Sequence, residues 1–171
     1  MNEDRLKRLA QKIERMAEHD EFLLAKAQRV VAVRRAAAMA LYGICSVLVN
    51  GLNRQMTNFK VDLSPDEFTP ETFRDTGVNL VQINFNGRLV QFAFESTDET
   101  VSTEYFSSPY VLQGAIRWFN QELLEERGIE EEQIFYCWNE KSGGTWRWMD
   151  PKSRRVGYLD GDHLMGVLER L

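Results

Sequence analysis

Apolar and polar residues alternate along two runs on either side of Asn86-Gly87. An Asn-Gly pair favours the positive φ angles of a two-residue turn, so the stretch Val78–Glu95 predicts a β-hairpin. The turn fixes the register, which predicts the facing pairs Phe85–Arg88, Ile83–Val90, Val81–Phe92 and Asn79–Phe94. One face of the hairpin is then apolar and needs a cover, and the helices predicted on either side of it in the chain could supply one.

A different spacing, alternately three and four residues, predicts an α-helix from residue 3 to about residue 57. The stripe on this helix consists of Leu6, Leu9, Ile13, Met16, Leu23, Ala27, Val30, Ala37, Leu41, Ile44 and Leu48. Asp20 and Arg34 interrupt it. His19-Asp20-Glu21 could be a break at which Asp20 caps a second helix, so a continuous helix and a helical hairpin both remain open.

The hairpin is preceded by a linker and followed by further predicted elements. In the linker, residues 61–77, two similar pentads predict one-turn helices that pin Phe68 and Phe73 onto the body, the first with a capping box. After the hairpin the pattern predicts a strand over 100–106, a helix over 109–127, strands over 134–139, 145–149 and 155–159, and a closing helix capped by Asp160 or Asp162. The turn between 139 and 145 allows two registers: a four-residue loop places Trp138 opposite Arg147, and a five-residue loop places it opposite Trp146.

These elements predict an α+β fold. A long N-terminal helix, or a helical hairpin, is followed by an antiparallel β-sheet of five to six strands, with a crossing helix and a C-terminal helix. At this level of element order alone, the arrangement is similar to small acidic type III secretion chaperones and to roadblock/longin-like modules. The similarity is one of architecture and implies no activity.

Charge divides the chain into a basic helical arm (1–60), the linker (61–77) and an acidic α+β domain (78–171). Residues 1–60 hold 11 Lys and Arg against 6 Asp and Glu, whereas residues 61–171 hold 10 against 20, within a net charge of −5. A basic helix can contact nucleic acid or anionic lipid. We favour contact with solvent or with the acidic domain, and do not expect a nucleic-acid partner.

Residues 36–53 contain no charged side chain, and this length reaches the lower limit of a membrane span. Its Asn, Gly, Ser and Ala residues are only weakly hydrophobic, which favours a buried helix or a helix–helix interface over a membrane segment. No apolar signal segment follows the charged N-terminus, and two cysteines suggest no disulfide framework. We expect a cytoplasmic protein.

Few residues suggest chemistry. The two histidines are far apart and the cysteines form no metal-binding spacing, so we predict no metal and no cofactor. The cluster Asp160-Gly-Asp162-His163 matches a helix N-terminus. Trp138, Trp146 and Trp148 gather around one turn, where they either join the core or form an exposed stacking surface with Arg147.

The sequence therefore favours a non-enzymatic protein–protein interaction or assembly module, chaperone- or adaptor-like, that uses its N-terminal helix for self-association or partner binding. The candidate interaction residues are Leu23, Ala27, Val30, Arg34, Leu41, Trp146, Arg147 and Trp148. If the stripe is an intermolecular seam, Asp20 and Arg34 could pair in an antiparallel dimer centred near Ala27. The alternative is a small-ligand-binding protein or enzyme with a site near Trp138, Trp146 and Trp148 and the residues Asp160, Asp162 and His163.

Overall fold

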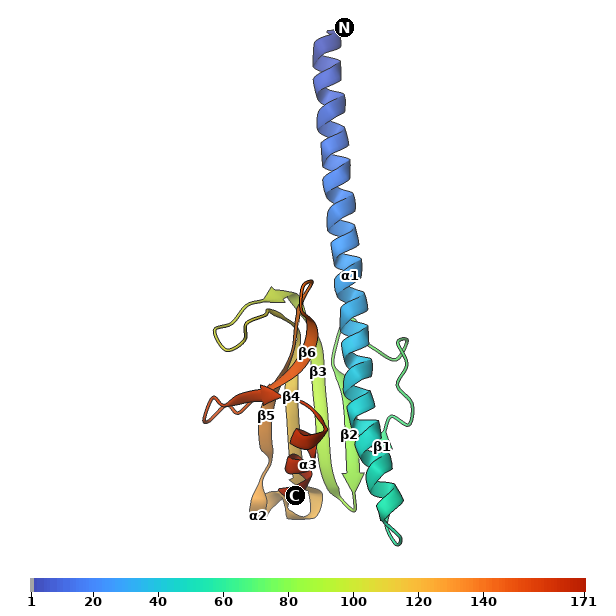
Figure 1. Ribbon diagram of the computed structural model, residues 1–171, viewed down its shortest axis with the longest axis vertical. Coiled ribbons are helices and arrows are strands. Elements are labelled where there is room, and N and C mark those ends of the chain that lie inside the picture. Colours follow the sequence, from blue (N-terminus) through green and yellow to red (C-terminus); the bar gives the residue numbers. More distant parts are fainter. Residues whose placement is uncertain (1) are drawn as a thin grey trace. The chain divides into compact units, whose positions relative to one another are not determined.

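The computed structural model describes residues 2–171 as an α+β protein (Figure 1). Its elements are α1 (Glu3–Gln55), β1 (Asp62–Ser64), β2 (Asn79–Phe85), β3 (Arg88–Val101), β4 (Tyr110–Asn120), a 3-10 turn (Gln121–Leu123), α2 (Leu124–Arg127), β5 (Glu130–Asn139), β6 (Gly143–Met149), β7 (Val156–Tyr158) and α3 (Gly161–Glu169). The predicted fold class is confirmed, with seven strands in place of five to six.

Helix α1 is continuous, so the break considered at His19-Asp20-Glu21 does not form. No proline interrupts the helix, and its first turn is capped by the Asn2 side chain, which accepts a hydrogen bond from the Arg5 N–H at 3.2 Å. The chain divides into two compact units, Met1–Val33 and Arg34–Leu171. The sequence placed the end of the arm at residue 60, whereas in the structure residues 34–60 belong to the same unit as the sheet.

The seven strands form one antiparallel sheet in the order in which they occur in the chain. The predicted β2–β3 hairpin is confirmed in every pair, from Phe85 opposite Arg88 to Asn79 opposite Phe94. Asn86 and Gly87 have φ angles of 52° and 82°, as the turn requires. Turn chemistry and side-chain alternation thus specify the same register.

The predicted crossing helix over 109–127 is wrong, because most of this stretch forms the central strand β4. Strand β4 lies between β3 and β5 and buries residues on both faces, including Val111, Leu112 and Ile116. A strand buried on both sides loses the simple alternation of apolar and polar residues, and its apolar positions then resemble a helical stripe. Only a short helical segment, α2, follows the strand.

Three other predicted elements need correction. The separate strand over 100–106 is absent, because β3 itself continues to Val101 and residues 102–109 form a loop. In the linker, residues 62–64 form strand β1, since the residue before a proline favours an extended backbone. The first pentad is a bend that follows β1 and the second is a turn, so neither is a capped helix, yet they do bury Phe68 and Phe73, each 5% exposed.

Neither predicted register of the β5–β6 hairpin forms. Tyr136 pairs with Trp146, and Asn139 pairs with Gly143 across a three-residue loop. The Asn139 side chain accepts hydrogen bonds from the Lys141 and Ser142 N–H groups at 2.9 and 2.7 Å, and Gly143 adopts a φ of 74°. An Asx turn followed by a left-handed glycine is the usual three-residue connection.

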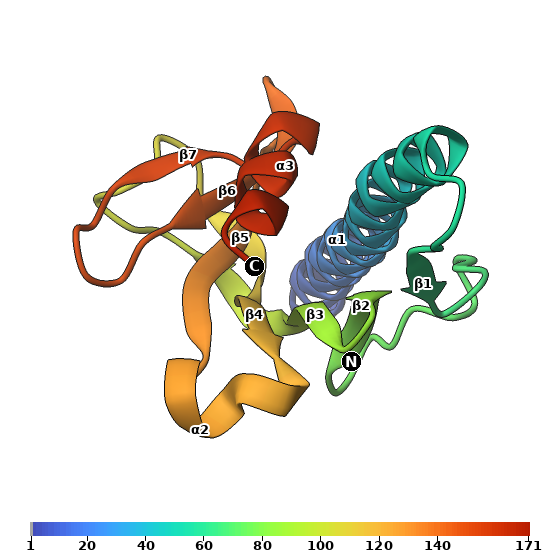
Figure 2. The ribbon, with the colours of Figure 1, turned by 90° about the horizontal axis from the view of Figure 1, so that it is seen from below.

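The core lies between one face of the sheet and two helical segments, residues 34–55 of α1 and the whole of α3 (Figure 2). Asp160 caps α3 by accepting a hydrogen bond from the His163 N–H at 2.9 Å, as the sequence predicted. The fully buried side chains at the centre of this layer include Leu41, Val81, Phe92, Ile116, Ile134 and Leu164. The helices therefore cover only one face of the sheet.

Candidate interaction surfaces

The N-terminal unit exposes a row of large aliphatic side chains along α1. Their exposed fractions are 52% for Leu6, 51% for Leu9, 57% for Ile13, 56% for Met16 and 48% for Leu23. Ala27 is also exposed and Val30 is partly buried. We call the positions from Leu6 to Val30 with this three–four spacing the arm seam. A single solvated helix gains nothing from such a row, because its aliphatic side chains remain in water.

The stripe changes its role at Arg34, which was a candidate for the intermolecular seam. The Arg34 side chain donates hydrogen bonds through Nε to the Val111 carbonyl at 2.9 Å and through Nη2 to the Thr97 carbonyl. Burial lowers the pKa of Arg34, and the nearby carboxylates of Asp75 and Asp98 oppose this effect. Because the protein's own backbone satisfies the guanidinium, the predicted Asp20–Arg34 pairing of an antiparallel dimer centred near Ala27 loses its basis.

Two other candidate interaction residues lie inside the core. Leu41 is fully buried, and Trp146 is 3% exposed. The Trp146 indole donates a hydrogen bond from Nε1 to the Ala37 carbonyl at 2.8 Å and meets Phe94 edge-on at 5.5 Å between ring centroids. These contacts hold α1 on the sheet and leave neither side chain open to a partner.

The residues of the predicted alternative site come partly together. The Trp148 and His163 rings stack with their centroids 4.4 Å apart, and His163 Nε2 lies 2.6 Å from the buried carboxylate of Glu132. Arg170 lies 3.4 Å from the other Glu132 oxygen, so two basic groups contact the one carboxylate. The contacts attach α3 to β5 and β6. Sequence patterns missed Glu132, because it lies far from these residues in the chain.

The remaining residues of that predicted site either serve their own helix or hairpin, or lie away from Trp148 and His163. Asp160 caps α3, and Asp162 borders an apolar groove. Trp138, half-buried, pairs with Gly144 in the hairpin. Arg147 lies in register opposite Phe135 and Tyr158, and strand alternation places it on the sheet face opposite Trp146 and Trp148. The tryptophans and Arg147 therefore do not form one surface.

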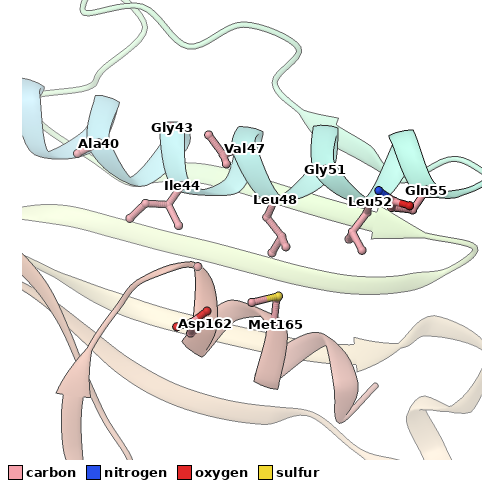
Figure 3. Close-up of a pocket in the computed structure, with 11 residues that line it drawn as sticks. Ala40, Gly43, Ile44, Val47, Leu48, Gly51, Leu52, Gln55, Asp162 and Met165 are labelled. Carbon is pink, nitrogen blue, oxygen red and sulfur yellow. The ribbon is translucent and has the colours of Figure 1, made fainter.

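The groove next to Asp162 lies between α1 and α3 and has a volume of about 690 Å³. Ile44, Leu48 and Leu52 of α1 line one side, and Met165 of α3 lines the other (Figure 3). Val47, at its rim, is 75% exposed. The α1 side of this groove falls almost entirely within the uncharged stretch 36–53, and Ile44, Leu48 and Leu52 also pack against the core that buries Leu41 and Cys45.

By length and composition alone, α1 is able to cross a membrane, since one 18-residue window has a mean hydropathy of 1.5 and 22% of it is buried in the protein. Within residues 2–171 no three His, Cys, Asp or Glu side chains gather closely enough to hold a metal ion. Comparisons with known protein families, curated proteins and solved structures find no match to the chain. Function is therefore inferred from its residues and their geometry.

Proposed function

We propose that this protein is a non-enzymatic assembly module of the cytoplasm that self-associates by pairing its arm seam with the arm seam of a second copy. The observation that carries the proposal is the row of half-exposed Leu, Ile and Met side chains at strict three–four spacing. That spacing averages 3.5 residues, which is the repeat of a left-handed coiled coil. Both cysteines are free thiols, which is consistent with a reducing compartment.

The area that association removes from water sets its expected strength. Full burial of a large aliphatic side chain contributes about 1.5–3 kcal/mol, so completing the burial of a half-exposed one contributes about 1 kcal/mol. Five such side chains in each of two copies give a gross gain of about 10 kcal/mol. Association itself costs about 4–15 kcal/mol. The balance predicts a weak, concentration-dependent dimer rather than a permanent one.

An antiparallel arrangement suits the seam better than a parallel one. Centred near Glu18, it places Leu6 opposite Val30, Leu9 opposite Ala27, Ile13 opposite Leu23 and Met16 opposite Asp20. All seam positions then overlap over about 37 Å. A parallel pair would set Asp20 against the Asp20 of the second copy, and two carboxylates in contact repel each other. The centre differs from the earlier expectation because Arg34 no longer takes part.

Sedimentation velocity or light scattering of the full chain over a wide concentration range tests the proposal. We expect the mean mass to rise from one chain toward two. Ile13→Lys places a charge in the seam and should keep the protein monomeric. Gln11→Lys introduces the same side chain on the outer face of the helix and serves as the matched control. A wild type that stays monomeric at every concentration, or an Ile13→Lys variant that associates as well as Gln11→Lys, would refute the proposal.

A further inference from the structure

A second pocket, of about 340 Å³, lies on the sheet face opposite the helices. Its walls come from three segments: the loop at Phe106–Ser108, the hairpin turn at Ser142–Gly144, and Tyr158 on the edge strand β7. Cys137, Thr145 and Arg147 form its floor, since all three project from β5 and β6 to this face. The pocket is distinct from the arm seam and from the apolar groove.

Arg147 is held at one edge and free at the other. Its Nε donates a hydrogen bond to the Gly157 carbonyl at 3.1 Å, and its guanidinium lies 4.4 Å from the centre of the Tyr158 ring and 5.4 Å from that of Phe106. Among residues 2–171, no carboxylate lies within ion-pair distance of it. Its two terminal nitrogens make no hydrogen bond within that range and are not buried. A guanidinium fixed through Nε presents these nitrogens as a rigid fork.

The other polar groups of the pocket are mostly hydrogen-bond donors. Ser107 and Ser142 contribute hydroxyl groups, whereas the Thr145 hydroxyl donates to the Trp146 carbonyl oxygen at 3.5 Å. Ser108 Oγ accepts a hydrogen bond from Asn139 Nδ2 at 2.5 Å, which leaves its own hydrogen available. Burial raises the pKa of the Cys137 thiol to about 11, so the thiol stays neutral and adds no negative charge. No Asp or Glu lines the pocket.

We propose that the Arg147 pocket binds a small carboxylate ligand, such as a compact organic acid. The two terminal nitrogens of Arg147 match the two coplanar oxygens of a carboxylate, and the hydroxyl groups around them supply further donors. A single cation balances one negative charge. The phosphate dianion is disfavoured, because it must give up more hydration than a monoanion in exchange for the same single guanidinium.

The wild-type protein can be tested directly by NMR, through the Nε–Hε signal of Arg147. At constant ionic strength, propionate and benzoate should move this signal saturably, with a dissociation constant on the order of 1 mM. Phosphate should bind at least ~10-fold more weakly, because a dianion loses more hydration on entering the pocket and one guanidinium balances only one of its two charges. A short peptide with a free C-terminus, compared with its amidated form, shows whether a peptide carboxylate can also enter.

Two variants test the mode of binding. Arg147→Lys keeps the charge but removes the fork, and should weaken carboxylate binding at least ~10-fold. Arg117→Lys, at a guanidinium already 2.6 Å from Glu131, is the matched control and should bind like the wild type. Ser142→Ala removes one hydroxyl from the pocket wall and should also weaken binding, so it tests the proposal even if Arg147→Lys disturbs the fold.

The proposal fails if no carboxylate shifts the Arg147 signal saturably, or if Arg147→Lys and Ser142→Ala, both folded by circular dichroism, bind like Arg117→Lys. Equal binding of phosphate and propionate would likewise overturn the assignment to carboxylates. Ile13→Lys should bind carboxylates like the wild type, because the pocket contains no seam residue. A variant that loses carboxylate binding but still self-associates, or the reverse, shows that the two proposals stand or fail independently.

Discussion

Gly114 lies at the middle of β4, opposite Phe94 of β3, where a methyl group has no room. A Cβ built at this position would lie 2.7 Å from the Phe94 Cα and 2.8 Å from its Cβ, and closer still to the Ala93 carbonyl oxygen. These are backbone atoms or atoms bonded directly to the backbone, so no side-chain rotation can relieve the overlap. Gly114→Ala therefore forces β3 and β4 apart at the point where Phe94 packs against Trp146.

The expected cost follows from these contacts. Overpacking of a close-packed interior costs about 1–3 kcal/mol, and occasionally more. The lower conformational entropy of alanine in the unfolded chain offsets about 0.5–1 kcal/mol of that. We expect a net loss of about 1–2 kcal/mol in the free energy of unfolding. For a domain of this size it corresponds to a fall in Tm of about 2–8 °C.

The same substitution in α3 provides a matched control of opposite sign. Gly166 has no heavy atom within 4 Å of an added Cβ, apart from its neighbours and its own helix. Because glycine is unfavourable inside a helix, Gly166→Ala should stabilise the protein by about 0.5–1 kcal/mol. Urea denaturation of both variants, with unchanged m-values, measures the difference. If Gly114→Ala is as stable as the wild type, Gly114 does not lie against Phe94 and this β3–β4 register is wrong.

Three further predictions address the core, the thiols and the seam. Phe92→Ala, at a fully buried position, should cost about 3–5 kcal/mol, whereas Gln91→Ala on the opposite face should cost less than ~1 kcal/mol. Equal costs in urea denaturation would contradict the placement of Phe92 in the helix-covered core and of Gln91 at a partly exposed position. Burial raises the pKa of Cys45 to about 12 and that of Cys137 to about 11, above the values near 9 expected in the unfolded chain. The unfolded state therefore loses these protons first, so the free energy of unfolding should fall as pH rises above 9, and less steeply in a Cys45→Ala, Cys137→Ala variant. Asp20→Leu should tighten self-association at least ~10-fold in sedimentation equilibrium by removing the one charged residue of the seam, and an unchanged mass distribution would place Asp20 outside the interface.

The elements that could be predicted from sequence are those in which local chemistry and periodicity agree. Asn86-Gly87 specifies a turn, the residues around it alternate, and every predicted pair of the β2–β3 hairpin forms. Asp160 caps α3 for the same reason, because its side chain suits the first N–H groups of a helix whose apolar residues share one face. In both cases the information lies within a few residues of the position that it determines.

The errors arise where distant neighbours determine the structure. Strand β4 is buried on both faces by strands and side chains far away in the sequence, and Ser108-Pro109 in front of it imitates a helix start. The β5–β6 register depends on the hydrogen bonds that the Asn139 side chain accepts in the turn. The sequence prediction considered only the number of loop residues, so it did not include the three-residue loop that forms. The Arg147 pocket was equally hidden, because Phe106, Ser142 and Tyr158 meet only after the sheet has formed.

The stripe on α1 shows what periodicity can and cannot specify. One spacing runs from Leu6 to Leu48, yet Leu41 is fully buried while Leu6 is half-exposed. Periodicity identifies the face of a helix that needs a partner, but the partner itself depends on what else the chain can bring against that face. Between Arg34 and Leu48 the partner is the protein's own sheet, recognisable by the Trp146–Ala37 hydrogen bond. Leu6, Leu9, Ile13 and Met16 are instead more than half exposed, and the same pattern that the sheet satisfies elsewhere is the reason to expect a second copy there.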